Sequence, residues 1–460
     1  MTTNGDATDV NPTTPPDNVW QPGLPLPLPP FAFTPRTDRA ILINAVASPP
    51  EDKTPITKAV PGLQINARIA SDATGEARFL LRLPDNWNGK LVVAGTPAQR
   101  SEFSSDYGWS DYVVQEGYAF ASQNKGVLNF YLTTATDPLG CRLNPASTTF
   151  VHFYDNDPGK DFSTWAQYMV KAATLARLGT LAAYGSFPRF TYAVGTSNGG
   201  YQVRRAVEVA PLLFDGGVDW EGTYVDENAP NILTDLPPGV LNYPDYQTSG
   251  FNAASTAAKN IGLAGYPPDL VNPALAAPLS SMWARYYFSY WEVTMCQWQK
   301  RLDPTYATYV SGLDTHNYVQ RLSFSDVGDN MADFATTGRI LKPLITVQGT
   351  LDALLPIDHH GRAYERAVEA TFDGLPAAAS RFAPAYRLYE VQNGNHIENY
   401  KSFYPSLEYI LPHAQAAFEL LVANVEHRAT LPPSQCIPRG GAIAASPAQA
   451  GHCTDLFVGP

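Results

Sequence analysis

Residues 191–201 read TYAVGTSNGGY, and they decide the fold. An apolar run that favours a β-strand ends at Gly195, and a helical pattern begins after Gly199. Ser197 stands between the two glycines, in the spacing G-x-S-x-G between a strand and a helix. A serine in so tight a turn has strained dihedrals, and small neighbours let the two segments close without a clash. The stretch predicts an exposed, nucleophilic hydroxyl, and a plain glycine-rich turn is the alternative.

Two later stretches contain the groups that such a serine needs. A serine hydroxyl is a poor nucleophile at neutral pH unless a base, oriented by a third group, lies beside it. LITVQGTLDALLP places Asp352 after one predicted strand, and YEVQNGNHIENY places His396 after the next. Loops at the carboxyl ends of parallel strands gather at one edge of a sheet. The order Ser197, Asp352, His396 is that of α/β-hydrolases. We expect Ser197 to attack a carbonyl carbon, His396 to carry its proton, and Asp352 to hold the imidazole tautomer.

The same turn predicts where a developing oxyanion would bind. The backbone N–H of Asn198, at the start of the predicted helix, is the first expected donor. The second should come from the loop after the predicted strand KLVVA, residues 90–94. Because Pro97 has no N–H, Thr96 or Ala98 must supply it, and the sequence leaves both open.

Other acids and histidines have simpler interpretations. Asp358 is the rival acid, but it lies where a helix N-cap is expected. His359 and His360 follow it, and we expect an exposed first helical turn there rather than metal ligands. Two acidic runs lack the ligand spacing of a calcium loop: Asp155 with Asp157, and Asp326 and Asp329 with Asp333. We expect neither a metal nor a cofactor.

Strands and helices alternate along most of the chain, which predicts a mostly parallel sheet with helices on both faces. Two short alternating segments, 63–70 and 77–83, predict an antiparallel pair at the sheet edge. The alternation stops between 224 and 339, where a long aromatic helix is expected from Met282 to Leu302. We therefore expect an α/β-hydrolase fold with a large inserted lid domain. Its expected parts are a Pro-rich N-terminal arm (1–38), the first part of the core (39–223), the lid (224–339), the second part of the core (340–428) and a tail (429–460).

Composition narrows the class of protein. With 460 residues, of which 44% are hydrophobic, the chain can bury a large core. Its net charge of -12 disfavours nucleic acid and anionic membranes as partners, and no apolar run is long enough to span a membrane. The expected partner is a small-molecule or oligomeric ester, and the oligomeric state is left open.

The four cysteines lack the C-x-x-C spacing of zinc sites: Cys141, Cys296, Cys436 and Cys453. A disulfide between Cys436 and Cys453 would tie down the Pro/Gly/Ala-rich tail and favours an oxidising compartment. Four buried thiols are the alternative. The first thirty residues have neither the basic n-region nor the apolar h-region of a signal peptide. We expect a secreted or periplasmic protein whose signal has been removed, with the cytoplasm left open.

Several stretches between about Lys90 and His427 resemble the tannase and feruloyl esterase family of α/β-hydrolases: QEGYAFASQNKG, GTSNGGYQVRRAVEVAPLLFDGGVDW, GTLDALLP and NGNH. The more specific parts are the GG after the serine, an arginine in the following helix (Arg204 or Arg205), and P-x-x-F-D-G at 211–216. Family members have a cysteine directly before the serine and another after the histidine. This chain departs from them with Thr196 and Ile397. The arrangement without that disulfide is also similar to 3-hydroxybutyrate oligomer hydrolases and polyvinyl-alcohol-type hydrolases.

The resemblance implies hydrolysis of carboxylic esters through an acyl-enzyme, with aromatic or phenolic esters as the first substrate class. Aliphatic hydroxyacid oligomers or β-diketones are the alternative, and a non-catalytic binding protein on a hydrolase scaffold is the third. Aromatic residues suit flat substrates because rings offer a large contact area at little entropy cost. The aromatic helix provides candidate lid contacts, of which some must be core because they cover more than one face: Tyr286, Tyr287, Tyr290 and Trp291.

Overall fold

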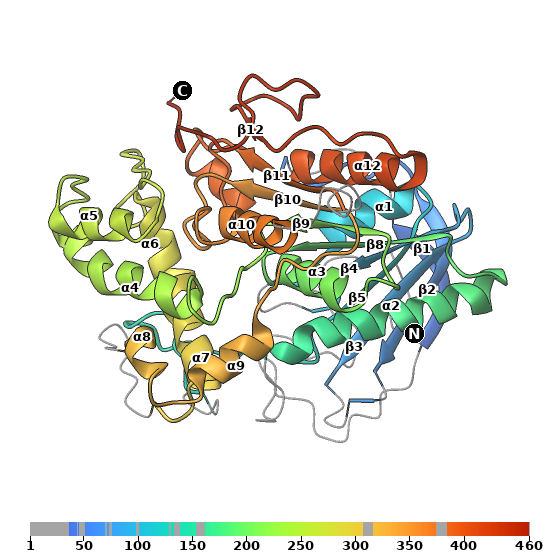
Figure 1. Ribbon diagram of the computed structural model, residues 1–460, viewed down its shortest axis with the longest axis horizontal. Helices are drawn as coiled ribbons and strands as arrows, with labels where there is room; N and C mark the ends of the chain where they lie inside the picture. Colours follow the sequence, from blue (N-terminus) through green and yellow to red (C-terminus); the bar gives the residue numbers. More distant parts are fainter. Residues whose placement is uncertain are drawn as a thin grey trace.

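The computed structural model describes residues 36–43, 45, 51–69, 71–72, 76–97, 101–127, 130–132, 139–152, 162–306, 316–373 and 384–459. Its centre is a ten-stranded sheet in the order β1-β2-β3-β5-β4-β8-β9-β10-β11-β12 (Figure 1). The strands are β1 (Arg36–Ile43), β2 (Val60–Arg68), β3 (Arg78–Pro84), β4 (Lys90–Ala94), β5 (Ala119–Gln123), β8 (Phe190–Thr196), β9 (Gly216–Trp220), β10 (Leu344–Gly349), β11 (Tyr386–Val391) and β12 (Gln435–Ile437), with β6 (Phe130–Leu132) and β7 (Phe150–His152) in a separate pair. Most of the expected arm lies outside the described residues.

The directions of the strands divide the sheet in two. β2 and β3 pair antiparallel, as the two alternating segments predicted, and β1 adds to them antiparallel. β3 also pairs antiparallel with β5, and from β5 to β12 every pair is parallel. The mostly parallel sheet is therefore confirmed. β1 and β12 were not expected: residues 36–43, at the junction of the expected arm and core, were given no strand, and 435–437 were assigned to the tail.

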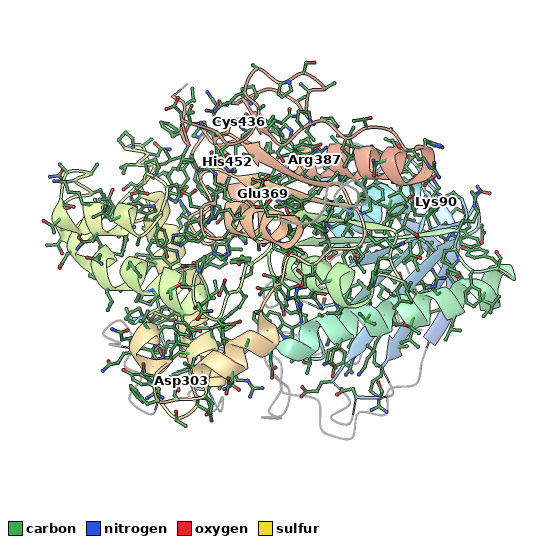
Figure 2. All side chains as sticks on the ribbon, in the orientation of Figure 1. Lys90, Asp303, Glu369, Arg387, Cys436 and His452 are labelled. Atoms are coloured by element: carbon green, nitrogen blue, oxygen red, sulfur yellow. A yellow bond between two sulfur atoms is a disulfide. The ribbon has the colours of Figure 1, made fainter. Side chains whose placement is uncertain are left out.

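Helices cover both faces of the sheet, and side chains fill the space between the layers (Figure 2). On one face, α1 and α12 pack on side chains such as Val92, Val194 and Val347. On the other, α2, α3 and α10 pack on the alternate positions, such as Leu91 and Ala193. Strands buried on both faces explain the continuous apolar runs of the sequence. The helices of these two layers are α1 (Asp111–Gln115), α2 (Ser163–Tyr184), α3 (Asn198–Val209), α10 (Gly361–Phe372) and α12 (Leu411–His427), with a π-helix η2 (Asp106–Ser110) before α1 and a 3-10 helix η4 (Glu398–Ser402) before α12.

A helical segment between β9 and β10 lies to one side of the sheet (Figure 1). It contains α4 (Ile232–Thr248), α5 (Thr256–Leu263), α6 (Met282–Tyr286), η3 (Tyr287–Trp291), α7 (Glu292–Leu302), α8 (Tyr318–Arg321) and α9 (Val327–Phe334). Its aromatic core continues into the loop after β10 at Leu351 and Leu355. The long helix expected from Met282 to Leu302 has these bounds, but a π-helical turn, η3, divides it. The disulfide Cys141–Cys296, which the sequence did not predict as a pair, ties α7 to the segment before α2.

Within the described part of the chain, no helix combines the length and the apolar character that crossing a membrane requires.

Candidate active site

Ser197 lies in the turn between β8 and α3 with φ 58° and ψ -123°. A positive φ is strained for a residue with a side chain. The turn is held because the Ser197 N–H donates to the Trp220 carbonyl at 2.8 Å. A Cβ atom at Gly195 would come within 2.3 Å of the Gly199 carbonyl oxygen, so only glycine fits there. The close approach therefore explains why the motif needs small residues around the serine.

The structure brings the three predicted groups together at the carboxyl ends of neighbouring parallel strands. The Ser197 hydroxyl lies 3.0 Å from His396 Nε2, and His396 Nδ1 lies 2.8 Å from Asp352 Oδ2. The other carboxylate oxygen of Asp352 accepts the N–H groups of Leu354 and Leu355 at 2.9 and 2.7 Å. The acid is thereby fixed on both of its oxygens. All three side chains are buried, at 7%, 8% and 0% exposure for serine, histidine and aspartate.

Sequence reasoning missed a second acid, Glu221, which follows β9. Its Oε2 lies 3.6 Å from His396 Nδ1, the nitrogen that Asp352 also contacts. Within the described ranges, Glu221, Asp352 and His396 are the one group whose ligand atoms lie close enough, within 4.8 Å, to hold a metal ion. A metal on Nδ1 would displace the proton that this nitrogen donates to Asp352, so metal binding and the triad arrangement exclude each other. The signal was present in the sequence, since Glu221 comes between a strand and a glycine.

Of the expected oxyanion donors, Asn198 lies beside the serine, whereas the N–H of Thr96 is engaged elsewhere. Asn198 begins α3 and lines the cavity beside the serine, and the first amides of a helix have no intrahelical acceptor. The N–H of Thr96 instead donates to Gln202 Oε1 at 2.8 Å. Thr96 was therefore a wrong prediction for this geometry, because a buried glutamine already takes its proton. Ala98 lies outside the described residues.

A cavity of about 570 Å³ opens above Ser197 and His396. Aromatic residues form much of its wall: Tyr107, Trp109, Trp220, Tyr290, Trp298 and Tyr400. Arg285 also lines it, with its guanidinium 3.7 Å from the centre of the Phe403 ring. Among the described residues, no carboxylate lies within 4 Å of Arg285, although its Nε donates to the Tyr404 hydroxyl at 3.1 Å.

Of the four candidate contacts on the aromatic helix, only Tyr290 lines this cavity. The other three are core, which corrects the prediction. Tyr286 donates to Asn395 Oδ1 at 2.6 Å, and Trp291 donates to the Ala353 carbonyl at 2.7 Å. Tyr287 stacks on a neighbouring tyrosine with ring centres 4.4 Å apart. These residues are core because the helix is surrounded by protein on several sides.

Two histidines that we expected in an exposed helical turn instead join the helical segment to the core. His360 is fully buried, and its Nδ1 accepts the Tyr224 N–H at 2.9 Å. His359 Nδ1 lies 2.9 Å from Asp235 on α4, and His360 Nε2 lies 3.3 Å from the same carboxylate. Burial alone would raise the pKa of Asp235, but the hydrogen bond with His359 and the adjacent His360 imidazole outweigh it and hold the pKa below its usual value. The hydrogen bond to Asp235 raises the pKa of His359.

An ion pair fixes the helix that follows the serine. Arg204 on α3 and Asp219 on β9 are both fully buried, with Nε and Oδ2 2.5 Å apart. Thr346 donates to the same carboxylate oxygen at 2.9 Å. Of the two arginines noted in the sequence, Arg204 is therefore the buried one. It ties α3 to the sheet directly behind the turn that carries Ser197.

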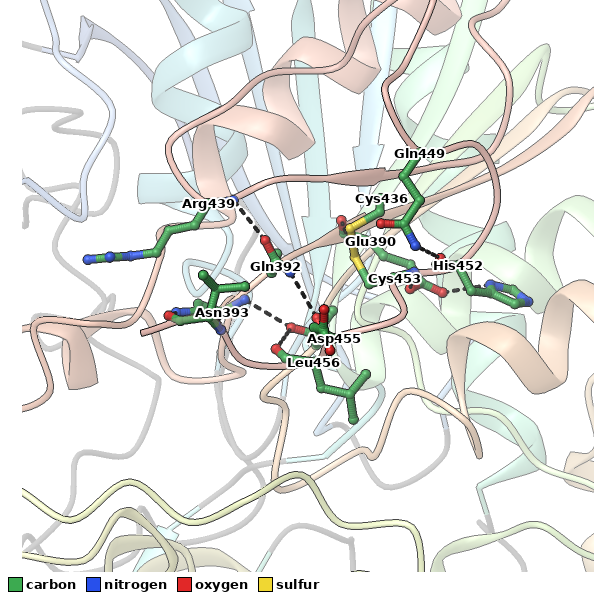
Figure 3. The surroundings of a disulfide bond; sticks show 12 residues. Glu390, Gln392, Asn393, Cys436, Arg439, Gln449, His452, Cys453, Asp455 and Leu456 are labelled. Carbon is green, nitrogen blue, oxygen red and sulfur yellow. Dashed lines mark hydrogen bonds and ion pairs between the residues drawn. A yellow bond between two sulfur atoms is a disulfide. The ribbon is translucent and has the colours of Figure 1, made fainter. Parts of the chain in front are cut away.

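The tail packs against the strand and loop that lead to His396 (Figure 3). Cys436 lies in β12 and forms the expected disulfide with Cys453. The Cys453 N–H donates to Glu390 Oε2 at 2.7 Å, and the Gln392 side chain donates to the Asp455 carbonyl at 2.9 Å. The Asn393 side chain accepts the N–H of Val458 and donates to the Val458 carbonyl, each at 2.8 Å. The tail is thus part of the support of the histidine loop, and through β12 it belongs to the sheet.

Two comparisons match parts of the sequence. A family model described as 3HB-oligomer hydrolase matches residues 313–455, a range that contains Asp352 and His396 but not Ser197. The D-(-)-3-hydroxybutyrate oligomer hydrolases of Burkholderia thailandensis and Ralstonia pickettii are 37% and 34% identical over 113 residues. These matches cover 23% of this chain and 15% and 14% of the relatives. The chain therefore matches only a small part of the length of those proteins.

Solved structures match over most of the chain. Feruloyl esterase B from Aspergillus oryzae superimposes with a TM-score of 0.51 at 14% identity, covering 86% of this chain and 87% of that one. Tannin acyl hydrolase from Aspergillus niger gives 0.52 at 12% identity, covering 91% and 86%. Two of the three resemblances noted in the sequence are found again: the 3-hydroxybutyrate oligomer hydrolases by sequence, and the fold of a tannase and a feruloyl esterase by structure. Identities this low establish the fold alone, and the fold is that of the α/β-hydrolases.

Proposed function

We propose that the protein is a serine hydrolase that cleaves carboxylic esters through an acyl-enzyme on Ser197. The single observation that carries the proposal is the chain of contacts from Ser197 Oγ through His396 to Asp352, at 3.0 and 2.8 Å, at the base of a cavity. A hydroxyl so placed can pass its proton to the imidazole as it attacks a carbonyl carbon.

The chemistry follows from these positions. His396 Nε2 takes the proton of Ser197 and later gives it to the leaving alcohol, while Asp352 stabilises the imidazolium. The negative charge on the substrate oxygen develops near the N–H of Asn198 and the positive end of α3. Water then attacks the acyl group by the same route, which regenerates the free serine.

Two substrate classes remain, and each has an observation that favours it. The aromatic wall of the cavity, with Tyr290, Trp298 and Tyr400, suits an aromatic or phenolic ester. Aliphatic hydroxyacid oligomers are favoured by the match to 3HB-oligomer hydrolases over the acid and the histidine. Arg285 adds to the second case, because a guanidinium that lines the cavity, with no carboxylate within 4 Å in the described ranges, would pair with the free acid end of an oligomer.

The location of the protein is part of the proposal. Disulfides form and persist in oxidising compartments, and the two disulfides support a secreted or periplasmic protein. We assign the role of a lid over the ester to the helical segment, since its residues Arg285, Tyr290 and Trp298 form part of the cavity wall.

A fluorophosphonate probe and activated esters test the proposed chemistry. Labelling should be abolished in Ser197→Ala, and kcat should fall by on the order of 10⁴ or more. Ser289→Ala is the matched control, because Ser289 lines the same cavity and no hydrogen bond joins it to a histidine among the described residues. Hydrolysis by Ser197→Ala at the native rate would refute the proposal.

A second assay separates the two substrate classes. Methyl ferulate is compared with the 3-hydroxybutyrate dimer and with the methyl ester of that dimer. Preference for the free-acid dimer over its methyl ester, lost in Arg285→Met, would establish the hydroxyacid class. Preference for methyl ferulate that is unchanged in Arg285→Met would establish the aromatic class.

A further inference from the structure

Each of four adjacent parallel strands is followed by a polar residue at the same edge of the sheet. Ser197 follows β8, Glu221 follows β9, Asp352 follows β10 and His396 follows β11. The mechanism above uses three of these residues and leaves Glu221 without a role. Glu221 is fully buried and has a φ of 52°, so its backbone is held in a conformation that few residues with side chains adopt.

The contacts of Glu221 direct its carboxyl group toward the histidine. Oε1 accepts the N–H of Gly349 at 3.2 Å, which fixes the group from the β10 side. Oε2 is buried, has no hydrogen-bond partner among the described residues, and lies 3.6 Å from His396 Nδ1. A buried oxygen without a partner costs free energy, so its retention beside a ring nitrogen requires an explanation.

The two acids are in different environments. Asp352 accepts two backbone N–H groups and also contacts the imidazole. Burial, then the nearby charge of Asp352 and then that of Glu398, raise the pKa of Glu221 well above its usual value, and they outweigh the lowering by the Gly349 N–H and the Trp220 side chain. Since two like charges so close cannot both be ionised cheaply, Glu221 is the acid that keeps its proton.

We propose that Glu221 is a positioning residue for His396, a second acid that lies behind the same ring nitrogen as Asp352 and can replace it. The proposal rests on the proposed function of Ser197, His396 and Asp352. In the resting enzyme the neutral Glu221 leaves a single negative charge beside the imidazole. If Asp352 loses its charge, Glu221 releases its proton to water and its carboxylate accepts the Nδ1–H.

Four proteins test this: the wild type, Glu221→Gln, Asp352→Asn and the double variant. Asp352→Asn should lower kcat at neutral pH by on the order of 10⁴ in the absence of a substitute acid. With Glu221 in place the loss should be smaller, and kcat/KM should rise by about tenfold per pH unit until Glu221 is ionised. Removal of the Asp352 charge also lowers the pKa of Glu221, which brings this rise toward neutral pH.

The double variant should lose the rise that depends on Glu221. Activity at high pH can also grow because hydroxide assists the serine, so the comparison between Asp352→Asn and the double variant is decisive. Asp352→Asn combined with Glu102→Gln is the matched control, because Glu102 is another buried glutamate, and burial raises its pKa to about 7, but it does not line the cavity. The control pair should keep the rise.

An infrared difference spectrum keeps the proposal falsifiable if Asp352→Asn does not fold. Wild type minus Glu221→Gln should show the carbonyl band of a protonated carboxylic acid at neutral pH. Its absence, or identical pH profiles of Asp352→Asn and the double variant, would overturn this proposal alone. Native activity in Ser197→Ala would overturn the proposed function and this proposal with it.

Discussion

Replacement of Cys436 and Cys453 by serine should inactivate the protein at temperatures at which the rest of the fold is intact. The disulfide closes a loop with a sequence separation of 17 residues. The tail from Cys453 onward bonds Glu390, Gln392 and Asn393, which lead directly to His396. Release of the residues from Cys453 onward therefore removes support from the proposed general base, while the strands from β1 to β11 stay paired.

The magnitude follows from the size of the loop. In the chain-entropy model a loop of this size stabilises its closed state by about 3 kcal/mol. The equilibrium between the docked and the released tail should therefore shift by on the order of 100-fold toward release. Residues 453–459 are then held by hydrogen bonds of about 1 kcal/mol each and by the packing of Phe457 against the core, so a measurable fraction of released tail should appear on warming.

Residual esterase activity and far-ultraviolet circular dichroism are measured after heating over the same temperature range. In the double serine variant, the midpoint for loss of activity should fall further than the midpoint for loss of helix. Gln449→Ala is the matched control, because Gln449 lies in the same loop and, in the described part of the chain, its side chain donates to the His452 carbonyl alone, at 2.6 Å. The reasoning is refuted if both midpoints fall by the same amount, since the tail would then unfold only with the whole protein.

Three further changes test other contacts. Asp235→Asn should lower the free energy of unfolding in urea more at about pH 6 than at about pH 9. The raised pKa of His359 gives stability that is present below its usual pKa and is lost as pH rises through the raised value. An equal loss of stability at the two pH values would contradict this. Tyr286→Phe removes the donor to Asn395 and should lower the free energy of unfolding by about 1 kcal/mol. Since Tyr286 does not line the cavity, kcat should fall without a rise in KM, and a rise in KM alone would contradict the prediction. Gly199→Ala would place a Cβ atom 2.6 Å from the backbone that faces it, so fluorophosphonate labelling should be lost, and labelling at the native rate would show that the turn can relax.

Local patterns predicted most of the sheet. β4 and β11 have the expected bounds, because each is a short apolar run ended by turn residues. β1 and β12 were missed because each is held by hydrogen bonds to a strand outside its own segment. The partner of β1 is β2, and the partner of β12 is β11. The tail was expected to depend on a disulfide, and that disulfide is present. Its place at the end of the sheet follows from the register with β11, which no local pattern contains.

The residues of the candidate site could also be predicted only in part. Residues directly after strands could be named, and Ser197, Asp352 and His396 lie together in the structure. The same rule would have found Glu221. Arg285 could not be found, because its place in the cavity depends on how α6 packs against the loop after β11.

The sequence by itself determined the order of strands and helices, the turn at Ser197 and the acid and histidine that follow it, because these depend on spacing along a few neighbouring residues. The tertiary structure decided which groups are free to act. It placed the Thr96 N–H on Gln202, the aromatic Tyr286 and Trp291 in the core, and a second carboxyl group, that of Glu221, behind the histidine. The physical reason is that hydrogen bonds, burial and the charge of a carboxyl group depend on partners distant in the chain, which only the folded packing brings within contact.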